Sequence, residues 1–115
     1  MKLQGVKREV RAMNGVAAEP TRAEVDALRG PVVLEFGASW CPHCIRAQPA
    51  IAAALARHPG VRHLKIEDGK GRRLGRSFQV KLWPTLIFMS NGNETARLVR
   101  PAEFGPIDDA LEAMD

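Results

Sequence analysis

Two cysteines separated by two residues carry the clearest chemistry in this sequence. Cys41 and Cys44 enclose Pro42 and His43, and this C-x-x-C run follows an apolar stretch and opens an Ala-rich one. Free backbone N–H groups and the helix dipole acidify a thiol at the first turn of a helix. The spacing therefore predicts a redox pair, in which Cys41 attacks a disulfide and Cys44 resolves the mixed disulfide.

The same cysteines are also compatible with half of a zinc site, or with two unreactive core thiols. A structural zinc site needs four ligands. The available imidazoles are those of His43, His58 and His63, and none of them is paired at ligand spacing. We therefore favour the redox pair, and we expect neither a metal nor an organic cofactor.

Glu35 is the third residue with a predicted chemical role. It stands within the apolar run Val32–Phe36, which reads as a buried central strand. A buried and unpaired carboxyl has a raised pKa, because burial disfavours the charged form. Such a group beside Cys44 would take the proton of that thiol during resolution. The alternative is a carboxylate at a sheet edge, exposed to water or paired with a basic side chain.

The segments around these residues alternate between strand and helix patterns. Strands are predicted at 32–36, 61–66, 85–89 and 95–99, and helices from about residue 22, at 42–57, at 71–78 and at 106–114. Thr21 and Glu24 form a capping-box pattern, and Asn91-Gly92 is typical of a hairpin turn. We therefore expect an α/β fold with a mixed central β-sheet, parallel in its first half and antiparallel in its second, flanked by helices on both faces.

Length and composition fit one globular domain. The chain has 115 residues, of which 45% are hydrophobic and 26% are charged. These values exclude disordered, collagen-like and coiled-coil proteins. We predict a single domain over residues 1–115. Residues 1–20 are ambiguous: they form either an N-terminal strand, followed by a loop at Asn14-Gly15, or a helical extension.

The charge distribution limits the choice of partners. Lys and Arg number 17 and Asp and Glu 13, a net charge of +4 that is spread along the chain. Nucleic-acid binders cluster such charge and interleave it with aromatics, so that role is disfavoured. The tract Lys70, Arg72, Arg73 and Arg76 is expected to be a solvated helix face, with an acidic partner as the alternative.

Hydropathy gives no sign of a membrane protein. No run of 18 apolar residues is present, and the segment Met1–Glu19 has no apolar core of the kind that a secretory signal needs. We therefore expect a cytoplasmic protein that does not bind membranes.

From about Thr21 to the C-terminus the chain resembles thioredoxin. The residues that carry the resemblance are Glu35-Phe36-Gly37-Ala38-Ser39-Trp40-Cys41-Pro42-His43-Cys44, then Pro49, Trp83-Pro84-Thr85 and Asn91-Gly92. The resemblance implies a thioredoxin-like fold and an oxidoreductase of protein disulfides. It also implies that Cys41 is an exposed nucleophile and Cys44 a buried resolving thiol. Trp40, Trp83, Pro84 and Thr85 would line the substrate site.

The resemblance further implies a cis peptide bond at Pro84, where the backbone of Trp83 would pair with a substrate strand. The alternative is an ordinary trans proline at a strand start.

Four residues, at three places in the chain, depart from thioredoxin's usual residues. Pro42-His43 replaces Gly-Pro and matches the dipeptide of the periplasmic disulfide oxidase of the Dsb type. An imidazole at His43 would stabilise the Cys41 thiolate, so we predict a reduction potential above the value of about −270 mV typical of thioredoxin. Glu35 replaces an Asp and is one methylene longer. Trp83 replaces a small aliphatic residue, and either narrows the substrate groove or covers the core.

The predicted partners are protein disulfides, together with a reductase or a thiol pool that supplies electrons. The protein is expected to act as a monomer. Two other functions are also compatible with the sequence. One is a non-catalytic interaction module with the same fold. The other is a metal or iron–sulfur carrier that uses Cys41 and Cys44.

Overall fold

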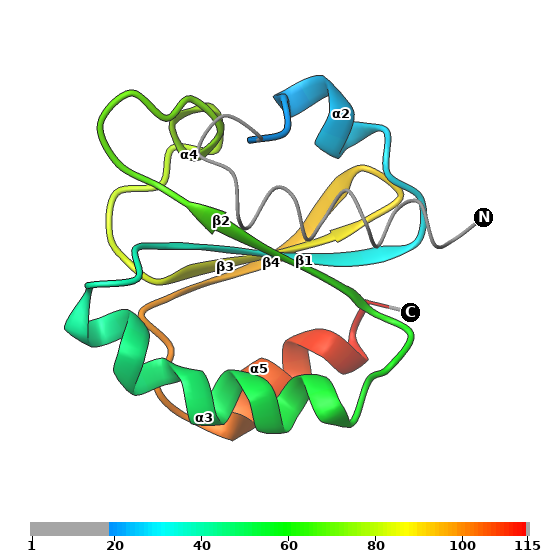
Figure 1. The fold of residues 1–115 in the computed structure, drawn as a ribbon. Helices are drawn as coiled ribbons and strands as arrows, with labels where there is room; N and C mark the ends of the chain where they lie inside the picture. The colour runs from blue at the N-terminus through cyan, green and yellow to red at the C-terminus, as the bar shows by residue number, and fades with distance from the viewer. Residues whose placement is uncertain (1–18, 115) are drawn as a thin grey trace.

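A computed structural model describes residues 19–114 of the chain (Figure 1). In chain order the elements are α2 (Arg22–Asp26), β1 (Pro31–Gly37), α3 (Pro42–Ala56), β2 (Arg62–Glu67), α4 (Leu74–Ser77), β3 (Thr85–Ser90), β4 (Asn93–Val99) and α5 (Phe104–Glu112). The predicted N-terminal strand or extension covers residues 1–20, of which 1–18 lie outside the described residues. No helix within residues 19–114 is long and apolar enough to cross a membrane.

The four strands form one mixed sheet in the order β2-β1-β3-β4. β1 is parallel to β2 and antiparallel to β3, and β3 is antiparallel to β4. Figure 1 shows α3 and α5 on one face of the sheet and α2 and α4 on the other. This arrangement confirms the predicted fold class. It also explains why polar and apolar residues do not alternate along Val32–Phe36, since both faces of β1 are covered.

Successive side chains of the strands point to opposite faces and form two cores. On the α2 and α4 face, Leu34 and Phe36 belong to a buried cluster with Leu74 and Phe78. On the α3 and α5 face the buried cluster includes Val33, Ala47, Ile51, Phe88, Ile107 and Leu111. These two cores hold the end of β1, and therefore the start of α3, in a fixed position.

Local sequence signals account for most element boundaries. The capping box of α2 is present, with Thr21 Oγ1 accepting from Glu24 N and Glu24 Oε1 accepting from Thr21 N, both at 3.0 Å. Asn91 and Gly92 have φ angles of 51° and 84°, as a two-residue hairpin turn between β3 and β4 requires. A side chain at Gly92 would also collide with the backbone oxygen of Asp26.

Two predicted helices have different bounds in the structure. α4 spans only Leu74–Ser77 instead of 71–78, because Gly69 and Gly71 adopt positive φ angles of 135° and 79°. Its first N–H groups are capped by a distant residue: Arg73 N and Leu74 N donate to Glu19 Oε2 at 3.0 and 3.1 Å. α5 begins at Phe104, two residues before the predicted start, and ends at Glu112.

Candidate active site

Cys41 is the N-cap residue of α3, and its sulfur serves as the capping acceptor. Cys44 N donates a hydrogen bond to Cys41 Sγ at 3.4 Å. Pro42 occupies the first turn, where it lacks only a donor that the helix would not use. Both cysteines are free thiols. The structure thus places the C-x-x-C pair at the helix N-terminus, as the spacing predicts.

Cys41 is less accessible than the resemblance implies. The residue is 5% exposed and Cys44 is 6% exposed, so the expectation of an exposed Cys41 is wrong. The reason is tertiary: Ala38, Cys41 and Cys44 form a small buried cluster, and Trp83 packs against it from the loop before β3. Only a narrow part of the Cys41 surface remains open to an incoming disulfide.

The surroundings of Cys41 favour its thiolate. Burial by itself raises the pKa of this thiol and is the largest single influence, but it is opposed first by hydrogen bonds from the thiol and the backbone N–H of Cys44. The backbone N–H of His43 and the positive charge of Arg100 add to the same effect, and the net pKa lies below its ordinary value. The contribution of His43 is made by its backbone; its imidazole Nδ1 lies 3.4 Å from Arg46 Nη2.

Cys44 has the opposite properties. The pKa of this thiol is raised to about 11, mainly by burial. The hydrogen bond to Cys41 and the negative charges of Cys41 and Glu35 also raise it. Gly37 lies against it at the end of β1, where a Cβ atom would stand only 2.6 Å from Cys44 Sγ. A residue without a side chain is therefore needed at position 37 for the resolving sulfur to occupy this place.

Glu35 is buried, as predicted, but it is not unpaired. The residue is 2% exposed, and its carboxylate accepts hydrogen bonds from His63 Nε2 and from Gln48 Nε2, both at 2.8 Å. Burial raises the pKa of Glu35, but these hydrogen bonds and the charges of His63 and Lys65 outweigh it. The net pKa is lowered, so the expectation of a raised pKa is wrong. The sequence alone does not show which side chains the fold places beside Glu35.

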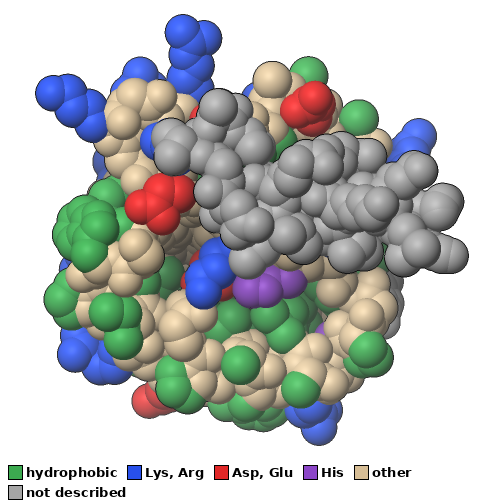
Figure 2. Space-filling view, viewed as in Figure 1, with side chains coloured by type: hydrophobic (Ala, Val, Ile, Leu, Met, Phe, Trp, Pro, Cys, Tyr) green, Lys and Arg blue, Asp and Glu red, His purple; other side chains and the backbone are tan. Residues whose placement is uncertain are grey.

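Glu35 and Cys44 line the same cleft, whose volume is about 240 Å³. Gln48 connects them, because its Nε2 also donates to the Cys44 carbonyl at 2.9 Å, while its Oε1 accepts from Lys65 Nζ at 3.0 Å. Figure 2 shows basic, acidic and His side chains meeting in a hollow on this face of the molecule. Gln48 was not predicted from the sequence, although its position four residues after Cys44 places both on one side of α3.

Three further predicted site residues lie in the loop before β3, namely Trp83 and Pro84, and at the first position of that strand, Thr85. The Trp83–Pro84 peptide bond is cis, which confirms that prediction. Pro84 is fully buried, so it shapes the loop and offers almost no surface of its own. Thr85 is 2% exposed, and its hydroxyl donates to the Leu82 carbonyl at 2.6 Å. A direct substrate contact by the Thr85 side chain is therefore ruled out in this conformation.

Trp40 and Trp83 form the rim of the site. Their rings meet edge to face with centroids 5.7 Å apart. Trp40 is 69% exposed, whereas Trp83 is half-buried and held in place by two polar contacts: its Nε1 donates to Asp68 Oδ2, and its carbonyl accepts from Arg100 Nε, both at 2.9 Å. Trp83 both packs on the cysteine cluster and lines a surface groove. Asp68 and Arg100 were not predicted from the sequence, because only the fold brings them to Trp83.

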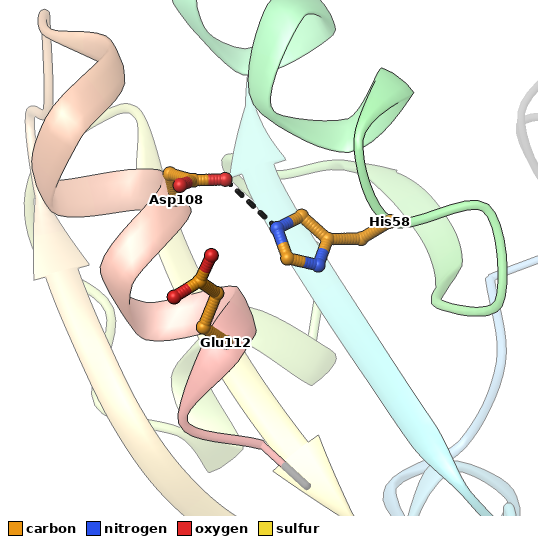
Figure 3. Close-up of side chains that lie close together, drawn as sticks. All are labelled: His58, Asp108 and Glu112. Atoms are coloured by element: carbon orange, nitrogen blue, oxygen red, sulfur yellow. Dashed lines mark hydrogen bonds and ion pairs between the residues drawn. The ribbon is translucent and has the colours of Figure 1, made fainter.

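A second cluster of titratable residues lies where the end of α3 meets α5 (Figure 3). One ligand atom from each of His58, Asp108 and Glu112 lies within 4.8 Å of the others. Asp108 Oδ1 accepts from His58 Nε2 at 2.8 Å and from Arg57 Nε at 3.0 Å, and Arg57 Nη2 donates to Glu112 Oε2 at 3.3 Å. A guanidinium already supplies the positive charge between the two carboxylates. The cluster therefore acts as an ion-pair network between the helices, about 22 Å along α3 from Cys41.

The chain and its fold match known proteins. The family model for thioredoxin matches residues 14–113. Thioredoxin 2 from Pseudomonas aeruginosa PAO1, solved in its reduced form, is similar with 54% sequence identity and a TM-score of 0.75, over 83% of this chain and 88% of that chain. Thioredoxin H5 of Arabidopsis thaliana is 33% identical over 72 residues, which is 63% of this chain.

The matches to whole relatives are partial. The aligned segment covers 61% of the Arabidopsis thaliana protein. It covers 47% of Thioredoxin C-3 from Corynebacterium nephridii, which is 34% identical over 68 residues, or 59% of this chain. The chain thus spans less than two thirds of the length of these relatives. The match to the family model, in contrast, extends over most of this chain. The chain belongs to the thioredoxin family.

Proposed function

We propose that this protein is a thiol–disulfide oxidoreductase that reduces or exchanges disulfides of other proteins through Cys41 and Cys44. The observation that carries the proposal is the asymmetry of the two thiols. Cys41 Sγ accepts the Cys44 N–H at the start of α3 and has a lowered pKa, whereas the pKa of Cys44 is raised to about 11. Cys41 is therefore the nucleophile, because the thiolate is the attacking form.

The reaction proceeds in two exchanges. The Cys41 thiolate attacks one sulfur of the substrate disulfide, which forms a mixed disulfide and releases the other substrate sulfur as a thiolate that takes a proton from water. Cys44 then loses its proton and attacks Cys41 Sγ, which releases the second substrate thiol. The substrate gains two electrons and two protons, and the protein is left with a Cys41–Cys44 disulfide.

Glu35 is assigned as the group that accepts the proton of Cys44, because both residues line the same cleft. A carboxylate with a lowered pKa is a weak base toward a free thiol. Proton transfer is therefore coupled to the attack of the sulfur rather than preceding it. Gln48 holds the carboxylate and the Cys44 carbonyl together through one amide group.

The rim residues are assigned to substrate positioning. Trp40 presents a large exposed ring beside Cys41, and Trp83 with Pro84 forms the loop along which a substrate segment would lie. Pro42 and His43 are assigned to tuning the potential of the pair. We further propose that the protein acts as a monomer in the cytoplasm, where a reductase or a thiol pool would return the disulfide to the dithiol.

The test is reduction of insulin disulfides with dithiothreitol as the electron source. The wild type is expected to reduce them, Cys41→Ser to be inactive, and Cys44→Ser to accumulate a mixed disulfide with the substrate. Equal turnover by wild type and Cys41→Ser would overturn the proposal and favour an interaction module. Bound metal or colour after anaerobic purification would instead favour a carrier of a metal or an iron–sulfur cluster.

A further inference from the structure

A groove with a basic lining lies next to the site. Its volume is about 440 Å³, and it is formed by the loop after β2, by α4 and by the loop before β3. Its charged and aromatic lining consists of Arg72, Arg76, Lys81, Asp68 and Trp83. We call these five residues the basic groove. Figure 2 shows Lys and Arg side chains projecting over the α4 end of the molecule, at the upper left.

The charge of the basic groove is not balanced by its own acidic residue. Among residues 19–114, Asp68 is the one acid in the lining, and its Oδ2 accepts the hydrogen bond from Trp83 Nε1. Arg72 lies 3.8 Å from Glu19. Arg76 and Lys81 are exposed, and within residues 19–114 neither side chain has an ion pair. The groove therefore offers two exposed cations to a ligand.

Trp83 connects the basic groove to the reacting sulfur. It lines the groove and also packs on the cluster that contains Cys41. Its carbonyl is bound by the exposed Arg100, whose charge acts on Cys41. A substrate segment that passes Trp83 on its way to Cys41 therefore meets cations in the groove and at the Trp83 carbonyl.

We propose that the basic groove binds an acidic segment of the substrate protein, so that disulfides flanked by Asp and Glu are preferred. This inference rests on the oxidoreductase function proposed above and names its substrate class. Complementary charge raises the rate at which two proteins meet, and it disfavours the binding of partners that carry the wrong charge. Because the cations are exposed, the preference should weaken as salt screens them.

The experiment uses the full chain and three peptides with the same internal disulfide, flanked on both sides by Asp/Glu, by Ser/Gln or by Lys/Arg. Reduction is followed as kcat/KM at low and at high salt. At low salt the acidic peptide is expected to be reduced about three- to tenfold faster than the neutral one, and the basic peptide more slowly. High salt should bring the three rates together.

Two charge reversals locate the effect. Arg76→Glu and Lys81→Glu should each reduce the preference for the acidic peptide and raise the rate with the basic peptide. The matched control is Arg29→Glu, which makes the same change in net charge at an exposed position before β1, about 20 Å along that strand from the start of α3. It should leave the preference unchanged. A higher kcat/KM with the basic peptide would also show that the variant is folded.

The outcomes separate this inference from the proposed function. If all three peptides are reduced at equal rates, the groove does not select substrates, and the oxidoreductase function stands. If Arg29→Glu reduces the preference as much as Arg76→Glu, net charge is responsible and the groove inference is overturned. If no peptide is reduced, and Cys41→Ser behaves like the wild type with insulin, the proposed function itself fails.

Discussion

The carboxylate of Glu35 is bound by the ring of His63, with 2.8 Å between Oε1 and Nε2. The two residues lie on neighbouring parallel strands, where His63 is opposite Val33 and Glu35 is opposite Lys65. His63 and Lys65 therefore face the same side of the sheet as Glu35. This neighbourhood keeps a carboxyl that is 2% exposed in its charged form.

The Glu35 pairing predicts a pH-dependent stability. The folded-state pKa is lowered from an ordinary value of 4.5, so the ionised carboxylate stabilises the fold above that pH, and the stabilisation is lost as the pH falls through the folded-state pKa. Glu35→Gln removes this titration. In urea unfolding, the free-energy advantage of the wild type over Glu35→Gln should shrink as the pH falls below about 4.5.

The control for this measurement is Glu103→Gln, at an exposed position with no side-chain cap hydrogen bond. It should change the unfolding free energy little over the same range. If the advantage of the wild type grew as the pH fell, burial would dominate and the pKa of the Glu35 carboxyl would be raised, contrary to the prediction.

The two thiols should differ in alkylation. At pH 7 the reduced protein should react with iodoacetamide at Cys41 first, with Cys44 at least about tenfold slower, because only Cys41 has a lowered pKa. Peptide mapping by mass spectrometry at increasing times gives both rates. Modification of Cys44 ahead of Cys41 would contradict the assigned roles.

Gly37→Ala should displace the resolving sulfur. The added Cβ would stand 2.6 Å from Cys44 Sγ, and overpacking of this kind costs about 1–3 kcal/mol. The free energy of unfolding should fall by that amount, and the mixed disulfide should persist longer during turnover. Gly105→Ala is the matched control, since nothing lies within 4 Å of its Cβ position. It should be neutral or slightly stabilising.

The network at the end of α3 predicts a salt-dependent stability. Asp108→Asn removes ion pairs with His58 and Arg57, which hold the pKa of Asp108 below its ordinary 3.8 against the opposing effect of burial. The variant should melt at a lower temperature than the wild type at pH 7. The difference should narrow below pH 3.8 and in high salt. Asp109→Asn, at the exposed next position, should leave the melting temperature almost unchanged.

The potential of the Cys41–Cys44 pair should lie above about −270 mV, because stabilising the thiolate stabilises the reduced form. Backbone N–H groups of His43 and Cys44 supply that stabilisation. Equilibration with glutathione buffers at pH 7 measures the midpoint. His43→Pro removes one of these N–H donors and should therefore shift the midpoint downward. A wild-type midpoint at or below −270 mV would refute the prediction.

Features that depend on a few neighbouring residues were predictable from the sequence. The capping box at Thr21 and the Asn91-Gly92 turn involve contacts within three residues. The N-cap position of Cys41 follows from where an apolar run meets an Ala-rich one. Stereochemistry and hydrogen bonding act locally at such places, so residue type and spacing are sufficient to predict them.

The electrostatics and accessibility of the site depended on tertiary structure. The pKa of Glu35 is set by His63 on β2 and Gln48 on α3. The cover over Cys41 depends on Trp83, which Asp68 and Arg100 hold in place. These groups are 13 to 28 residues from Glu35 and 15 to 17 residues from Trp83 along the chain. Burial and charge act through space, so a pKa or an exposed surface is determined only once folding brings such groups together.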